Sequence, residues 1–192
     1  QKSSNDCLNL IKEFEGYAKE LADGSAKAYL DPVGIWTIGW GATRNLDEGR
    51  SIREGDIISR ETAERWLLEE VDQTANVVEE LCTVTITQSM FDALVSFGYN
   101  TGIGGGGLRT STLLKKLNEK DYEGAALQFG RWVNGEVNGQ KVALPGLVRR
   151  RKAEEILFRR DGLSGAINST STDAQDSTAP VEVRQYQPAP TP

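Results

Sequence analysis

A long amphipathic run in the first half of the chain constrains the fold more than any other feature. From Ser59 the sequence reads SRETAERWLLEEVDQTANVVEEL, and Ser59 is a suitable N-cap. Apolar residues recur along one side of this run at helical spacing: Ala63, Trp66, Leu67, Val71, Val77 and Val78. The run therefore predicts a long helix with one apolar side.

Five further helices are predicted from apolar spacing and capping residues. The first follows Ser4 and Asn5 and carries Leu8, Ile11 and Phe14 on one side. Another opens at Thr85 and Gln88, which form a capping-box pattern. Shorter helices are expected at residues 112–118 and 121–132, and a last one at residues 146–160.

One segment departs from the helical pattern. Residues 28–41, AYLDPVGIWTIGWG, place β-branched and aromatic residues on both sides of a D-P-V-G turn signal. This pattern predicts a β-hairpin. The fold class is therefore expected to be α+β, mostly helical, with a small β-region near the N-terminus.

The composition changes near residue 162. From there the sequence reads GLSGAINSTSTDAQDSTAPVEVRQYQPAPTP, which is rich in Ser, Thr, Ala and Pro. Such a segment cannot bury enough surface to offset its ordering entropy. We expect residues 1–161 to form one folded domain and residues 162–192 to be a tail or linker. A docking strand for a partner is the alternative for the tail.

Composition also excludes several classes of function. The chain has no histidine, which excludes Ser-His-Asp and Cys-His catalysis and His-liganded zinc. Its 22 basic and 28 acidic residues give a net charge of -6, which argues against nucleic-acid binding. Cys7 and Cys82 are too few and too far apart for a cysteine-only metal site, and either one disulfide or two free thiols fits them. No metal or cofactor is predicted.

The sequence offers few indications of cellular location. No segment reaches the roughly 18 consecutive apolar residues that a membrane-spanning helix needs. Because the sequence begins with Gln1 rather than Met, we expect an N-terminal piece to have been removed, by processing or by design. A cleaved export signal is one such piece.

Two acids around the predicted hairpin suit the cleavage of a glycosidic bond. That reaction needs one carboxyl to protonate the leaving oxygen and a second, ionised one near the anomeric carbon. Glu15 lies at the predicted C-terminal end of the first helix, where the helix dipole disfavours an ionised carboxylate. Asp31 lies in a turn, where water and backbone donors keep it charged, and Thr37 brings a hydroxyl nearby. By spacing alone, a solvated surface acid is the more ordinary interpretation, and three other acids fit nearly as well: Glu13, Glu20 and Asp23.

The same segment, FEG…AYLDPVGIWTIGWGAT, resembles the active-site region of phage-type lysozymes, the endolysin muramidases. The resemblance continues in QSMFDALVSFGYNTG, STLLKKLNEKDYEGAALQFGRWVN and LPGLVRRRKAEEILF, and runs in family order over about residues 7 to 160. It implies two lobes joined by a long helix, and inverting cleavage of the β-1,4 bond between N-acetylmuramic acid and N-acetylglucosamine in peptidoglycan. On this resemblance Glu15 is the general acid, Asp31 the second catalytic carboxylate, and Thr37 the third member of the triad.

Weaker positions are carried over in the same way. Phe97 and Asn134 match places where relatives line the glycan cleft, although a core aromatic and a loop cap explain them equally well. Trp36 and Trp40 are candidates for stacking on sugar faces, and core packing is the alternative.

Three features depart from the family pattern. The segment YAKELADGSAK resembles an insertion between Glu15 and Asp31, which either lengthens the first helix or forms a flap over the cleft. Gly41-Ala42-Thr43 stands where the family commonly has Gly-His-Thr. The segment NGEVNGQKVALPG carries extra residues and is expected to form a longer loop at the cleft edge.

A glycine-rich segment and a basic run are both expected to have structural roles. The glycine-rich TGIGGGGLRTST lacks the Gly-Lys-Ser/Thr of a phosphate-binding loop, so a flexible loop between helices is expected. The basic run RRRK at residues 149–152 is expected to form ion pairs within the chain, with Glu154, with Glu155 and with Glu15. Binding the anionic peptide stems of peptidoglycan is the alternative.

The predicted function is therefore peptidoglycan hydrolysis. The predicted partner is the glycan strand, nucleic acid is not a predicted partner, and a monomer is expected. The protein is expected to be exported or released to the bacterial cell wall. Two alternatives remain: a lytic transglycosylase, and a cell-wall-binding or virion structural module without activity.

Overall fold

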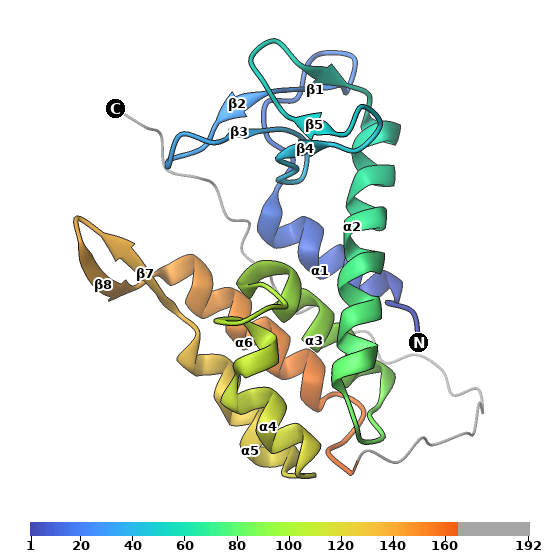
Figure 1. The fold of residues 1–192 in the computed structure, drawn as a ribbon, viewed down its shortest axis with the longest axis vertical. Coiled ribbons are helices and arrows are strands. Elements are labelled where there is room, and N and C mark those ends of the chain that lie inside the picture. The colour runs from blue at the N-terminus through green and yellow to red at the C-terminus, as the bar shows by residue number, and fades with distance from the viewer. Residues whose placement is uncertain (165–192) are drawn as a thin grey trace, which may run out of the picture.

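Helix α2 (Arg60–Leu81) is the predicted long helix and connects two lobes (Figure 1). The computed structural model describes residues 1–164. The hydroxyl of Ser59 caps α2 by accepting a hydrogen bond from the backbone N–H of Thr62 at 3.1 Å. Trp66, near the start of α2, is buried in the core of the β-containing lobe, whereas Val71 and Val78 are buried in the core of the helical lobe. One apolar stripe thus serves both cores.

The helical lobe is built around α3 (Gln88–Thr101), whose residues from Ser89 to Gly98 are all buried. Helix α3 contacts α1 (Asn5–Glu15), α2 and α6 (Pro145–Arg159). The lobe is completed by α4 (Thr112–Asn118), α5 (Tyr122–Gln128) and the 3-10 turns η1 (Leu108–Thr110) and η2 (Phe129–Arg131). The first helix of the chain therefore packs with the last one in a single lobe.

The small lobe contains three antiparallel pairs of two-residue strands. The pairs are β1 (Ala26–Lys27) with β6 (Ile57–Ile58), β2 (Tyr29–Leu30) with β3 (Trp36–Thr37), and β4 (Arg44–Asn45) with β5 (Arg50–Ser51). Their core consists of Ala26, Ala28, Ile38, Ala42, Ile52 and Trp66. The predicted hairpin at residues 28–41 is thus one pair, β2–β3, of a larger β-region.

A fourth pair forms an exposed hairpin where only a longer loop was predicted. Strand β7 (Asn134–Val137) pairs with β8 (Gln140–Ala143), and the hairpin projects from the helical lobe on the side where the β2–β3 turn projects from the other lobe (Figure 1). Its turn residues, Asn138 and Gly139, both have positive φ, 51° and 76°. Asn-Gly is the preferred pair for such a two-residue turn.

The structure corrects two local predictions. Helix α3 is capped by Thr87, whose hydroxyl accepts from the N–H of Met90 at 3.1 Å, and not by Thr85. The insertion after Glu15 does not lengthen α1, which ends at Glu15. Instead the insertion joins the β-region through bridges from Ala18 to Gly39 and from Glu20 to Ala26.

Both cysteines are free thiols, Cys7 buried and Cys82 half-buried. Burial raises the pKa of the Cys82 thiol to about 11, and it raises that of Cys7 further. Within residues 1–164, no helix combines the length and the apolar character needed to cross a membrane. The predicted tail lies almost entirely outside the described residues.

Candidate active site

Glu15 is the last residue of α1, and two opposite neighbours fix its carboxylate. Arg150 on α6 donates from Nη1 to Oε1 at 2.8 Å. On the other side the backbone of Gly41 approaches so closely that a Cβ there would lie 3.0 Å from Oε2. Gly41 also has a φ of +89°, which side-chain-bearing residues rarely adopt. The Glu15 side chain keeps 23% of its surface exposed, so a substrate can still reach it.

Arg150 belongs to a buried ionic network beneath Glu15. Glu154 is fully buried and accepts from Arg150 Nε at 3.2 Å and from the Ser96 hydroxyl at 2.7 Å. Its other oxygen lies 2.7 Å from Arg151 Nε. Burial raises the pKa of Glu154, and the two guanidinium groups and Ser96 oppose that shift. The predicted ion pairs of the basic run with Glu154 and with Glu15 are confirmed, whereas Glu155 pairs with Arg159, outside the run.

Asp31 opens the turn between β2 and β3. Its Oδ1 accepts from the backbone N–H groups of Val33 at 2.9 Å and of Ile35 at 2.8 Å. The main chain closes the turn from Asp31 N to Ile35 O at 2.9 Å. The backbone of the turn thus holds the Asp31 carboxylate in one position.

Thr37 and Tyr29 lie opposite each other on β3 and β2. Thr37 is 5% exposed, and its hydroxyl donates to the carbonyl oxygen of Ile35 at 3.0 Å, within the turn that holds Asp31. Burial raises the pKa of the Tyr29 phenol, and the charges of Asp31 and Glu15 add to that rise. Tyr29 thus lies two residues before Asp31 and opposite Thr37 on the same strand pair.

The candidate sugar-binding residues occupy different environments. Trp40 is 5% exposed, and its ring packs 4.6 Å from that of Tyr17, with Lys12 Nζ at 4.7 Å. Phe97 is fully buried and packs edge-on against Trp132 at 5.3 Å. Trp36 is half-buried and Asn134 is exposed at the start of β7. Exposure thus suits Asn134 for sugar contact better than Trp40 or Phe97, and all these contacts stay predictions.

Sequence reasoning missed a half-buried carboxylate on α2. Glu70 on α2 accepts from the hydroxyl of Tyr99 on α3 at 3.2 Å. A signal was present, because Glu70 falls in the same helical stripe as Trp66, Leu67 and Thr74, which are buried. A charged residue on the buried side of a helix is expected to have a hydrogen-bond or ion-pair partner, or to take part in function.

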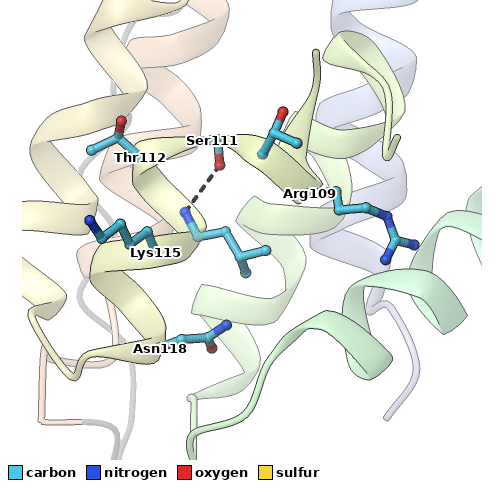
Figure 2. Close-up of a pocket in the computed structure, with 7 residues that line it drawn as sticks. Arg109, Ser111, Thr112, Lys115 and Asn118 are labelled. Atoms are coloured by element: carbon cyan, nitrogen blue, oxygen red, sulfur yellow. Dashed lines mark hydrogen bonds between the residues drawn. The ribbon is translucent and has the colours of Figure 1, made fainter. Parts of the chain in front are cut away.

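The described residues also contain a cavity that is separate from the candidate catalytic residues. A cavity of about 270 Å³ lies between η1 and α4, and Figure 2 shows Arg109, Ser111, Lys115 and Asn118 around it. The N–H of Leu114 donates there to the Ser111 hydroxyl at 3.0 Å. None of the candidate catalytic residues lines this cavity. No cluster of three or more Cys, Asp and Glu side chains suited to a metal ion occurs within residues 1–164.

Comparison with known proteins decides the family. The model of the family described as phage lysozyme matches residues 12–154. The chain belongs to the phage lysozyme family. It is 42% identical over 151 residues to the endolysin of Acyrthosiphon pisum secondary endosymbiont phage 1, a match that covers 79% of this chain and 93% of that one.

Solved structures agree with this assignment. An endolysin from Escherichia coli O157:H7 phage FAHEc1 superimposes with a TM-score of 0.74 at 35% identity, over 84% of this chain and 95% of the other. The muramidase domain of SpmX from Asticaccaulis excentricus gives a TM-score of 0.69 at 34% identity, over 83% and 98%. The predicted α+β lysozyme-like fold is therefore confirmed, and phage lysozyme membership supports a peptidoglycan hydrolase that lyses cell walls.

Proposed function

We propose that this chain is a muramidase that hydrolyses the β-1,4 bond between N-acetylmuramic acid and N-acetylglucosamine. The observation that carries the proposal is the contrast between its two acids. Glu15 stands partly exposed between Arg150 and Gly41, whereas backbone donors hold Asp31 in a turn. Two carboxyls in different environments are what acid-assisted glycoside hydrolysis requires.

In the proposed mechanism, Glu15 delivers a proton to the leaving glycosidic oxygen. Asp31 acts as the general base and activates a water on the opposite face of the sugar, which gives inversion at the anomeric carbon. The Thr37 hydroxyl donates to the carbonyl oxygen of Ile35, within the turn that holds Asp31. In this mechanism that bond keeps Asp31 positioned toward the reacting water. Asn134 on the edge of β7 is the proposed polar contact to the glycan.

We further propose that the protein works as a monomer on glycan strands of the cell wall, after export or release. In this proposal residues 1–161 form the catalytic domain and residues 162–192 a tail or linker. A muramidase and a lytic transglycosylase differ in what attacks the anomeric carbon: water in the first, and in the second a hydroxyl of the sugar itself, which closes an anhydro ring.

The test compares the wild type with Glu15→Gln on purified peptidoglycan. We expect the substitution to lower the rate of clearing by about a thousandfold, because the leaving oxygen loses its proton donor. Glu13→Gln is the matched control, since Glu13 is exposed on the same helix two residues away. It should clear the substrate at close to the wild-type rate.

Mass spectrometry of the products completes the test. Reducing N-acetylmuramic acid ends support the muramidase, and anhydro ends would replace it with a transglycosylase. A folded wild type that binds the wall without clearing it would contradict the proposal and favour a binding module.

A further inference from the structure

The β7–β8 hairpin carries two copies of a chemically labile dipeptide. Asn-Gly occurs twice in the sequence, as Asn134-Gly135 and as Asn138-Gly139, and both copies lie in this hairpin. Each copy is preceded by a valine, so the local sequence is the same, Val-Asn-Gly. In such a pair the backbone nitrogen of glycine can attack the side-chain carbonyl carbon of asparagine, because glycine has no side chain to shield that nitrogen. The proposed mechanism makes no use of Asn138.

The ladder of the hairpin occupies one of the two glycine nitrogens. Val137 and Gln140 close the two-residue turn as a hydrogen-bonded pair, and such pairs alternate along an antiparallel ladder. The next hydrogen-bonded pair is therefore Gly135 with Val142. Gly135 also lies against Leu144, whose Cδ1 would be 2.3 Å from a Cβ at that glycine. The nitrogen of Gly135 is thus held in the ladder, and it cannot approach the preceding asparagine side chain unless the strands separate.

The turn leaves the other copy able to react. Asn138 and Gly139 are the two turn residues, and their N–H groups lie outside the ladder, which ends at the pair that closes the turn. Both residues are exposed. Within the described part of the chain, neither the Asn138 carboxamide nor the Gly139 nitrogen has a hydrogen-bond partner. The attacking nitrogen and the attacked carbonyl are therefore both available in the folded protein.

We propose that Asn138 is a site of spontaneous deamidation, which the hairpin ladder selects over Asn134, and that its modification slows the clearing of peptidoglycan. The nitrogen of Gly139 bonds to Cγ of Asn138, and ammonia leaves with the proton of that nitrogen, which closes a succinimide ring. Water then opens the ring at either of its carbonyl carbons. The product is aspartate or isoaspartate, and water is the only co-reactant.

The reaction places a negative charge at the tip of a hairpin beside the proposed glycan site. The hairpin begins at Asn134, the proposed glycan contact, and projects on the side where the turn that holds Asp31 projects from the other lobe (Figure 1). The new carboxylate adds to a net charge that is already -6, and it repels an anionic substrate. Clearing of peptidoglycan therefore slows as the protein ages. This second part of the inference rests on the proposed function.

Peptide mass spectrometry tests the chemistry without any need for activity. The wild type is incubated at mildly alkaline pH, folded in one sample and unfolded in urea in another, and the mass gain of deamidation is followed at each asparagine. In the folded protein we expect Asn138 to convert about tenfold faster than Asn134, because Gly135 reacts only after the ladder opens locally. In urea the two rates should agree, since the ladder is absent and the local sequence is the same.

Two results would overturn the first part of the inference. One is an equal rate of conversion at Asn134 and Asn138 in the folded protein, which would show that the ladder selects nothing. The other is an unmodified Asn138 in the folded protein over a period in which the unfolded chain converts both residues. Asn138→Gly is the matched variant, because it removes the carboxamide and keeps a residue suited to positive φ. It should leave the slow rate at Asn134 unchanged.

Clearing of peptidoglycan by fresh and by aged protein tests the second part. Asn138→Asp reproduces the aspartate product, and we expect it to clear about threefold more slowly than the wild type at low salt and equally fast at high salt, where the added charge is screened. The wild type should lose activity on ageing, whereas Asn138→Gly should keep it. Equal loss on ageing in the wild type and in Asn138→Gly would overturn this part. A protein that never clears, fresh or aged, would refute the proposed function, and the mass spectra would still decide the modification site.

Discussion

At the scale of single residues, Glu15 depends on a partner that is itself buried. Arg150 keeps only 4% of its side-chain surface exposed and bonds both Glu15 and Glu154. Removing one member of a buried ionic network leaves the others without compensation, which costs more than the network contributes as a whole. Arg150 therefore connects the stability of α6 with the position of the proposed acid.

Replacing Arg150 with methionine tests this connection. We expect Arg150→Met to lower the free energy of unfolding by about 3 kcal/mol, because Glu154 loses a buried cation. Clearing activity should fall by about a hundredfold, because the Glu15 carboxylate loses its anchor. Chemical denaturation and peptidoglycan clearing measure the two effects. Lys152→Met, at an exposed position on the same helix, is the control, and equal losses in both variants would contradict the prediction.

Some contacts of the site residues could be predicted from the sequence and others could not. Four consecutive basic residues on a helix are distributed around most of its circumference, so some of them must lie against the rest of the protein. The RRRK run therefore predicted ion pairs within the chain, and the pair with Glu15 was among them. The bond from Tyr99 to Glu70 could not be predicted, since it joins two helices across 29 residues of sequence. Spacing within one helix says nothing about which residue of another helix will face it.

At the scale of elements, the β-region depends on polar contacts because its strands are so short. Arg50 donates from Nη1 and Nη2 to the two oxygens of Asp56 at 2.8 and 2.9 Å. The N–H of Arg53 donates to the same carboxylate at 3.0 Å. These donors, the Arg50 guanidinium foremost, hold the pKa of Asp56 below its ordinary value.

The lowered pKa fixes the sign of a pH effect. A carboxyl whose pKa is lower in the folded state stabilises the fold above its unfolded pKa, and this stabilisation is lost as the pH falls through the folded value. Asp56→Asn should therefore cost about 1 kcal/mol near neutral pH, and the cost should disappear as the pH falls below about 4. Urea unfolding at a series of pH values measures it. Glu54→Gln in the same loop is the control, and a cost for Asp56→Asn that does not change with pH would count against the prediction.

Elements were predictable from sequence where they are long. The repeat along α2 extends over 22 residues, which is enough for its period to be unmistakable. The strands of the small lobe have two residues each, so no alternation of apolar and polar positions can develop within them. The β7–β8 hairpin was signalled only by its Asn-Gly turn.

At the scale of the whole molecule, the net charge of -6 opposes an anionic substrate. Repulsion between exposed like charges is long-range and is screened over about 10 Å at 0.1 M salt. We therefore expect clearing of peptidoglycan to rise with added salt to an optimum and then to fall. An uncharged soluble glycan oligomer, which the protein's field does not repel, is the control substrate. A monotonic fall in clearing from the lowest salt concentration would refute the prediction.

The packing of α1 against α6 also determines when the proposed acid can be assembled. Glu15 leaves the ribosome 135 residues before its partner Arg150. A nascent chain that stops before α6 lacks both the cation that anchors Glu15 and one of the helices that α1 packs against. The catalytic arrangement therefore stays incomplete until α6 has been translated, although Glu15 is present in the nascent chain well before then.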